Sequence, residues 1–181
     1  MEPHDQRTLA AAAQSGDADA WESLYVAVHP RLRGYLVRRV GASEVDDVLN
    51  ETMVRAVAAI GRFRWESAGF DGWLFGIARR TSAEHVRRAV RNQRVPPIHE
   101  AAAPDFDEAL VLANDHAVVR RAFDALRSAD RELLELRVVA GLSAEQVAVA
   151  LGKRPGAIRT AQSRAIARLR SLLEEMTDDG S

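Results

Sequence analysis

The chain has 181 residues, 47% of them hydrophobic, and a formal net charge of −1 at neutral pH. It contains no cysteine, which excludes disulfide bonds, thiolate metal sites and a cysteine nucleophile. No segment approaches the roughly 20 apolar residues that span a bilayer, and the start lacks a signal-peptide pattern, so we expect a cytoplasmic protein without membrane insertion.

Apolar residues recur at helical spacing and alternating strand patterns are scarce, so we predict an all-α fold. The predicted helices span 7–15, 17–40, 44–61, 70–92, 108–126, 129–140, 144–151 and 155–175. Pro30 should break or kink the second of them. A proline-rich acidic stretch separates the fourth from the fifth and is typical of a linker. We therefore expect two small helical domains, 7–94 and 115–176, joined by a flexible acidic linker, 95–114.

The predicted helix 44–61 has two different faces. An apolar stripe should point into a core and consists of Val45, Val48, Leu49, Thr52, Ala56 and Ile60. Asp46, Asp47, Asn50 and Glu51 gather on the other side. Acids near the positive end of a helix are common on an ordinary solvated face. The residues alone therefore leave two interpretations open, a solvated face and a binding surface.

The next segment, 62–80, combines arginines with half of the ten aromatic residues of the chain. Aromatic faces beside cations provide stacking and charge for unpaired bases. A structural alternative is that Phe63, Phe70, Trp73 and Phe75 belong to a helical core. Trp65 lies between charged residues in a predicted loop and is harder to bury.

Residues 128–173 have the pattern of a helix-turn-helix. Gly141 should end one helix, Ser143 and Gln146 form a capping box for the next, and Pro155 should open the last one. Between Lys153 and Arg170 there are six basic residues and no acidic one. A cationic last helix suits insertion into the DNA major groove, although an arginine-coated surface helix is the structural alternative.

The order of these features resembles the extracytoplasmic-function (ECF, group IV) sigma factors of bacterial RNA polymerase. The resemblance rests on Asp-Asp-Val-Leu-Asn-Glu-Thr at 46–52, Phe-Arg-Trp-Glu-Ser at 63–67, Trp-Leu-Phe-Gly-Ile-Ala-Arg-Arg at 73–80 and the helix-turn-helix. It covers about 20–92 and 118–173. It implies a region 2 that docks on the polymerase and melts the −10 element, a region 4 that recognises the −35 element, and a linker that enters channels of the enzyme, although a plain acidic spacer remains an equal alternative.

The resemblance also assigns roles to residues at matching positions. The polymerase-docking set, expected to meet the β′ clamp helices, is Asp46, Asp47, Asn50 and Glu51. The −10 set is Arg64, Trp65, Glu66, Ser67, Trp73, Arg79, Arg80, Arg87 and Arg88. The −35 set is Arg154, Arg159, Thr160, Ser163, Arg164 and Arg168, on a domain expected to contact the β flap. Trp65, Arg80 and Ala161 depart from the common family pattern, so base preferences do not transfer.

The implied partners are core RNA polymerase, promoter DNA and an anti-sigma factor. We expect no cofactor, no metal and no catalytic residues, because the five histidines have no ligand spacing and no nucleophile or P-loop motif occurs. The main alternative is a dimeric helix-turn-helix regulator. That class of protein does not need an acidic docking helix and an aromatic-arginine loop.

Overall fold

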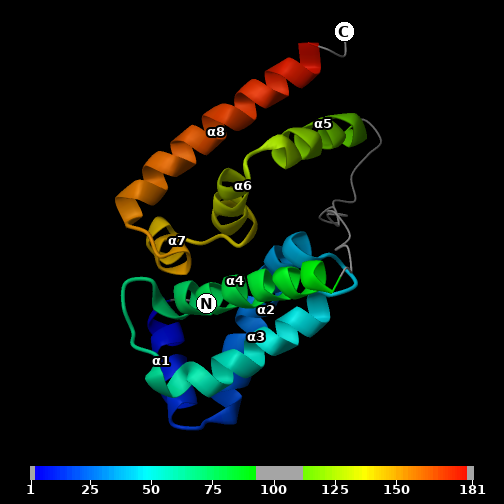
Figure 1. The fold of residues 1–181 in the computed structure, drawn as a ribbon. Helices are drawn as coiled ribbons and strands as arrows, with labels where there is room; N and C mark the ends of the chain where they lie inside the picture. The colour runs from blue at the N-terminus through cyan, green and yellow to red at the C-terminus, as the bar shows by residue number, and fades with distance from the viewer. Residues whose placement is uncertain (1–2, 93–111, 179–181) are drawn as a thin grey trace.

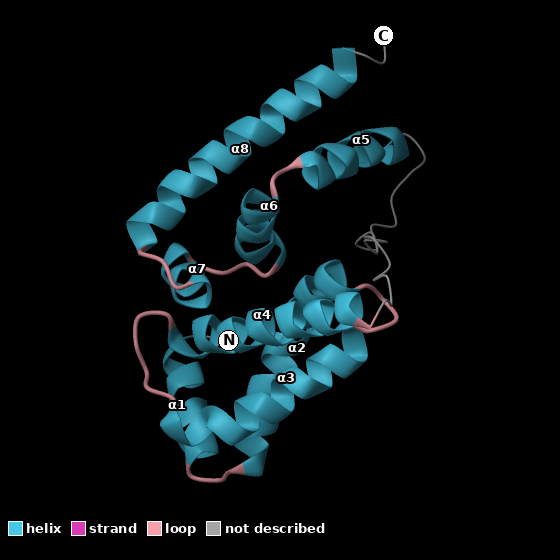
Figure 2. Ribbon diagram, in the orientation of Figure 1, coloured by secondary structure: helices cyan, strands magenta, loops and turns pink. Residues whose placement is uncertain are grey.

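The computed structural model describes residues 3–92 and 112–178, and every regular element in these two ranges is helical (Figure 1, Figure 2). The helices are α1 (Pro3–Gln14), α2 (Ala18–Val40), α3 (Val45–Ala59), α4 (Gly69–Arg91), α5 (Leu112–Ala125), α6 (Ser128–Leu134), α7 (Ala144–Leu151) and α8 (Pro155–Asp178). A 3₁₀ turn, Ile60–Arg62, follows α3, and a π-helical segment, η2 (Glu135–Val139), follows α6. The prediction of an all-α fold is confirmed. The predicted linker lies mostly outside the described residues.

Helices α1 to α4 form the first bundle, shown in blue to green in Figure 1. Asp17 caps α2 by accepting a hydrogen bond from the backbone N–H of Ala20. All six residues of the predicted apolar stripe on α3 are buried. The centre of this bundle is Tyr35 of α2 against Phe75 of α4, with ring centroids 5.6 Å apart. Helices α2 and α4 are thereby fixed against each other.

The second helix is not broken at Pro30, so this part of the prediction is wrong. Helix α2 runs from Ala18 to Val40 with Pro30 inside it. Proline removes one backbone N–H and so leaves the carbonyl of Val26 without its helical donor. The helix nevertheless continues for ten more residues, to Val40, and Val26 itself is 63% exposed.

Helices α5 to α8 form the second bundle, which contains the predicted helix-turn-helix. The capping box is present: the Ser143 side chain accepts from the Gln146 backbone, and the Gln146 side chain accepts from the Ser143 backbone. Gly141 and Gly152 both have φ of +64°, the left-handed conformation that ends a helix. Ile158 and Ala165 of α8 are buried against the rest of this bundle. The local signals therefore place α7 and α8 as predicted.

The two bundles pack directly against each other. Helix α7 lies on α4, and α6 with η2 lies over α2 (Figure 1). Leu136, Ala140, Val147 and Ala150 of the second bundle belong to one continuous apolar cluster with the core of the first. No helix within the described ranges is long and apolar enough to cross a membrane.

Candidate nucleic-acid and partner surfaces

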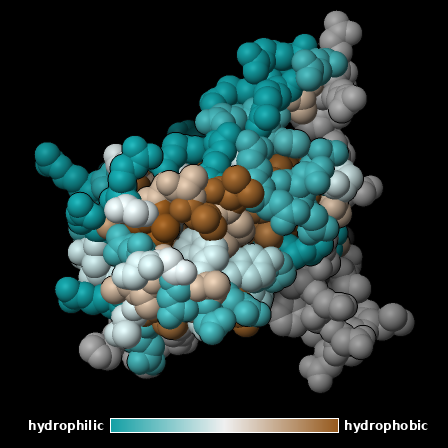
Figure 3. Space-filling model, turned by 90° about the horizontal axis from the view of Figure 1, so that it is seen from below, coloured by the Kyte–Doolittle hydropathy of each residue, from teal (hydrophilic) through white to brown (hydrophobic). Residues whose placement is uncertain are grey.

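The outer face of α3 presents both acidic and apolar side chains. Asp46, Asp47 and Asn50 are exposed, as predicted from their spacing. Val54 and Val57 continue the same face and are 68% and 50% exposed. The sequence interpretation missed these valines, although Val54 follows Asp47 by two helical turns. Figure 3 shows a hydrophobic patch framed by hydrophilic side chains on the underside of the molecule.

Glu51 differs from Asp47 and Asn50 in being paired with arginines, and Asp46 also lies 3.4 Å from Arg33 of α2. The Glu51 carboxylate lies 2.6 Å from Arg55 on the same helix and 3.1 Å from Arg88 of α4. Arg55 also pairs with Glu84 at 2.7 Å, and this hydrogen bond lowers the pKa of Glu84. Glu51 thus joins α3 to α4 in this conformation, whereas Asp47 and Asn50 face outward.

The aromatic residues after α3 form a cluster with a buried base and a partly exposed edge. Phe63 and Phe70 are buried, and their rings lie 6.2 Å apart. Trp73 is half-buried and lies 5.0 Å from Phe63. Trp65 stands edge-on to Phe63 at 6.1 Å and is also half-buried. The core interpretation holds for the phenylalanines, whereas both tryptophans keep part of their surface accessible.

The loop beside this cluster has a polar rim. Arg64, Glu66 and Ser67 are exposed. Gln14 of α1 fixes the start of the loop, because its side-chain amide donates to the backbone carbonyls of Ile60 at 3.0 Å and of Phe63 at 2.8 Å. A rigid anchor with an exposed rim is a suitable platform for a ligand that enters from solvent.

Some of the arginines of α4 are paired with acids of other helices. Arg80, Arg87 and Arg88 are exposed. Arg88 pairs with Glu51, and Arg79 donates through Nε to Glu132 Oε1 of α6 at 3.1 Å. The positive surface predicted for α4 is therefore partly neutralised by other parts of the chain.

Helix α8 and the residue before it present most of the predicted DNA-contacting residues to solvent. The exposed members are Arg154, Arg159, Thr160, Ser163 and Arg164. Glu145, near the start of α7, accepts a hydrogen bond from Arg159. A hydrogen bond from its own backbone N–H lowers the pKa of Glu145, and a second one from the Ser143 side chain lowers it further. The carboxylate is therefore placed to hold the Arg159 guanidinium.

Two other arginines are tied to the framework of the second bundle. Arg168 is half-buried and lies 2.5 Å from Asp130 of α6. Arg137 of η2 donates to Gln162 of α8 at 2.8 Å and to the backbone carbonyl of Leu142. These contacts fix the orientation of α8 relative to the turn before α7.

Comparison with known proteins decides between the classes considered above. Residues 24–92 match Sigma-70 region 2, and residues 116–169 match Sigma-70 region 4. The ECF RNA polymerase sigma factor ShbA of Streptomyces griseus is 34% identical over 176 residues, which cover 90% of this chain and 92% of ShbA. The chain belongs to the ECF family of RNA polymerase sigma factors. The ECF sigma factor SigD of Mycobacterium tuberculosis is 33% identical over 171 residues, covering 90% of this chain and 81% of SigD.

Two solved structures resemble this ECF sigma factor over most of its length. CnrH, in complex with the cytosolic domain of CnrY, has a TM-score of 0.68 and 26% identity and covers 94% of this chain and 98% of its own. RpoE of Bartonella quintana, in complex with the anti-sigma factor NepR, has a TM-score of 0.65 and 25% identity, with coverage of 84% and 96%. The matches identify a transcription initiation factor and not an enzyme.

Proposed function

We propose that the chain brings core RNA polymerase to promoters through three surfaces: the outer face of α3, the aromatic loop with the arginines of α4, and the exposed side of α8. Residues 7–94 act as region 2, which docks on the polymerase and opens the −10 DNA. Residues 115–176 act as region 4, which recognises the −35 element and contacts the β flap, and 95–114 connect them. Support comes chiefly from one observation: a capped helix-turn-helix with an exposed arginine-bearing face shares the chain with an aromatic loop and an outward acidic helix face.

Docking on the β′ clamp helices involves the outer face of α3. Asp46, Asp47 and Asn50 supply charge and hydrogen-bond acceptors that steer a cationic partner helix and set its orientation. Val54 adds apolar surface, which a partner helix can cover. Glu51 contributes indirectly, because its pairs with Arg55 and Arg88 hold α3 and α4 together.

Opening of the −10 DNA involves the loop and the arginines of α4. The exposed rim of Arg64, Glu66 and Ser67 surrounds the accessible edge of Trp65, where an unstacked base finds an aromatic surface. Trp73 supports this edge through Phe63. The phosphate backbone is followed by the α4 arginines of the −10 set: Arg79, Arg80, Arg87 and Arg88. Contacts of this kind govern affinity and its salt dependence more than sequence preference.

Recognition of the −35 element involves the exposed side of α8. Arginine pairs with the O6 and N7 edge of guanine in the major groove, and hydroxyl groups accept or donate to several bases. Arg159, Thr160, Ser163 and Arg164 supply these groups, with Arg154 placed for a phosphate. Arg168 supports the helix through Asp130 in the present conformation.

An anti-sigma factor is the further partner that we propose. Two similar sigma factors were solved with such inhibitors or with a partner's cytosolic domain, CnrH with CnrY and RpoE with NepR. Both matches extend over most of this chain, so the surfaces available to a regulator are comparable.

Run-off transcription with purified bacterial core polymerase, on DNA upstream of the protein's own gene, tests the function. We expect a defined transcript that the double substitution Asp47→Ala and Asn50→Ala reduces at least about tenfold, because interface hot spots cost more than about 1 kcal/mol each. Asp19→Ala, an exposed acid on α2, is the matched control and should leave transcription unchanged.

Failure of the chain to bind core polymerase, with DNA binding retained, would contradict the proposal. A two-fold symmetric footprint without polymerase would instead support a dimeric regulator.

A further inference from the structure

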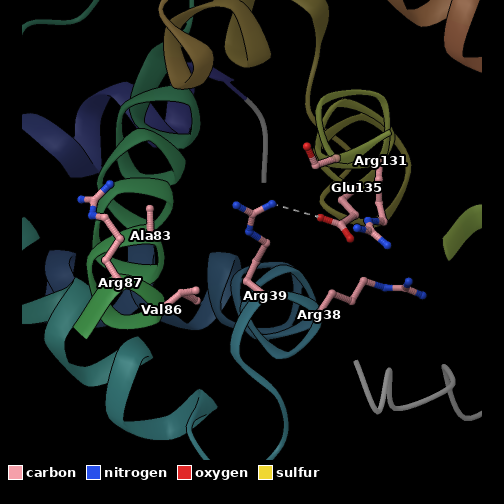
Figure 4. Close-up of a pocket in the computed structure, with 8 residues that line it drawn as sticks. Arg38, Arg39, Ala83, Val86, Arg87, Arg131 and Glu135 are labelled. Carbon is pink, nitrogen blue, oxygen red and sulfur yellow. Dashed lines mark ion pairs between the residues drawn. The ribbon is translucent and has the colours of Figure 1, made fainter. Parts of the chain in front are cut away.

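A cavity of about 330 Å³ lies where α2, α4 and α6 with η2 face one another (Figure 4). This volume is at the lower end of the range for small-molecule sites. The lining includes four arginines and a single acid, a charge balance that suits an anionic ligand. The lining residues are Arg38 and Arg39 of α2, Ala83, Val86 and Arg87 of α4, and Ser128, Arg131 and Glu135 of the second bundle.

Three of these arginines gather around Glu135. Figure 4 shows Arg39 pointing toward the Glu135 carboxylate, with Arg131 beside that group. Arg38, Arg39 and Arg131 all lie close enough to act on its charge. Arg39 is also paired with Glu132 of α6 at 3.1 Å. The positive charge of the cavity is therefore concentrated at this end.

Arg38 and Arg131 keep hydrogen-bond donors available for a ligand. Arg38 makes no ion pair with any described residue, and its guanidinium lies over the Phe123 ring of α5, 5.7 Å from the centroid. Arg131 lies 3.7 Å from the Asp124 carboxylate and donates to the Asp124 backbone carbonyl at 3.1 Å. A guanidinium has five N–H donors, so both side chains can serve a further acceptor.

Glu135 supplies an unsatisfied polar atom in the wall of the cavity. Its side chain is only 4% exposed, and no described residue forms a hydrogen bond with its Oε2, which is 3.8 Å from the Arg39 guanidinium. Burial raises the pKa of Glu135 to about 7 against the opposing effect of the nearby arginines. A protonated carboxyl group donates to an acceptor. A bound anion would therefore satisfy both the arginines and this carboxyl group.

The lining also selects a class of anion. A phosphate monoester presents three oxygens to several guanidinium groups at once, whereas a carboxylate presents two, and the arginine fork matches phosphate geometry. The arginines oppose a metal cation, and the described residues hold no cluster of potential metal ligands. Ala83 and Val86 add an apolar wall on α4, which favours a ligand with a carbon skeleton over an inorganic ion.

We propose that this cavity binds a small organic phosphate, with its phosphate group among Arg38, Arg39 and Arg131 and its carbon skeleton against the apolar wall of α4. The site goes beyond the proposed function, because Arg38 and Arg131 belong to none of its three surfaces. The ligand contacts both bundles, which gives a phosphorylated metabolite a direct point of action on the chain.

Isothermal titration calorimetry of the full chain with phenyl phosphate, at constant ionic strength, tests the proposal. We expect saturable binding at a single site. The double substitution Arg38→Ala and Arg131→Ala should raise Kd at least about tenfold, because it removes charge-assisted hydrogen bonds. Glu135→Gln removes a carboxylate charge but keeps a donor, so it should bind at least as tightly as the unsubstituted chain. Arg120→Ala with Arg121→Ala removes the same charge from the exposed side of α5 and should leave Kd unchanged.

Circular dichroism checks that each variant folds, and Arg38→Gln alone, which should also raise Kd, replaces the double variant if that chain does not fold. Absence of saturable binding to the unsubstituted chain, or an equal loss of binding in the α5 control pair, would overturn the proposal. Inorganic phosphate that binds as tightly as phenyl phosphate would contradict an organic ligand.

The double variant also separates a small ligand from nucleic acid as the source of the phosphate. It should keep the duplex DNA affinity of the unsubstituted chain in fluorescence anisotropy. A loss of DNA affinity as large as the loss of phenyl phosphate affinity would assign these arginines to DNA and overturn the proposal. None of these measurements needs polymerase, so their failure is distinct from a failure of run-off transcription.

Discussion

At the scale of single residues, burial changes the chemistry of one carboxyl group most clearly. Glu135 is 3% exposed, and burial raises its pKa to about 7 despite the nearby Arg39. Arg38, Arg131 and Glu132 also act on this group. Because the folded state holds the proton more tightly than the unfolded state, folding gains stability from this group at low pH. That gain is lost as pH rises through about 7.

The substitution Glu135→Gln should therefore flatten the pH dependence of stability. We expect the free energy of unfolding of the unsubstituted chain to fall by on the order of 2–3 kcal/mol between pH 5 and pH 8 relative to the variant. Urea unfolding followed by circular dichroism at several pH values measures this difference. Contributions from other titrating groups are common to both proteins and cancel in the difference.

Glu174→Gln, on the exposed end of α8, is the matched control and should keep the slope of the unsubstituted chain. A Glu135→Gln slope equal to that of the unsubstituted chain would contradict the proposed role of burial.

At the scale of secondary-structure elements, the helix-turn-helix depends on the capping of α7. The Ser143 hydroxyl satisfies the Gln146 backbone N–H, and the Gln146 side chain satisfies the Ser143 backbone N–H. Helix α7 has only eight residues, so most of its stability comes from packing and from this cap.

Ser143→Ala should destabilise the protein by about 1 kcal/mol. For a chain of this size, the melting temperature should fall by about 2–4 °C. Differential scanning calorimetry provides the measurement. Ser171→Ala on the exposed side of α8 removes a hydroxyl without removing a cap and should leave the melting temperature unchanged; equal shifts for both variants would contradict the capping role.

At the scale of the whole molecule, the net charge is only −1, but the positive and negative side chains are unevenly distributed. Several arginines on α4 and α8 are engaged by acids elsewhere in the chain, as for Arg79 with Glu132 and Arg168 with Asp130. DNA affinity should therefore depend on the exposed arginines of α8, chiefly Arg159, which also pairs with Glu145, and Arg164, and not on the total count of cations.

The double substitution Arg159→Ala and Arg164→Ala should weaken duplex DNA binding and reduce the slope of log affinity against log salt by up to about 2, as expected for two lost ionic contacts. Anisotropy titrations between low and physiological salt measure the slope. Arg120→Ala with Arg121→Ala removes the same charge from the exposed side of α5. An equal effect of the two pairs would contradict a specific role for α8.

The helices, the capped turn and the buried stripe of α3 could be predicted from the sequence, because these features depend on residues a few positions apart. The sequence also carried the motifs that resemble ECF sigma factors. The predicted break at Pro30 was wrong, because α2 continues through this residue to Val40.

Which charged residues face solvent could not be predicted from the sequence and depends on how the helices pack. Glu51 turns toward Arg88, 37 positions away, and Arg79 toward Glu132, 53 positions away. No local pattern identifies such pairs, because they form only when the packing of α3, α4 and α6 brings their side chains within hydrogen-bond reach. The close approach of α7 to Gly72 and Gly76 of α4 has the same origin: it depends on how two separately patterned bundles fit together, which periodicity within each bundle does not specify.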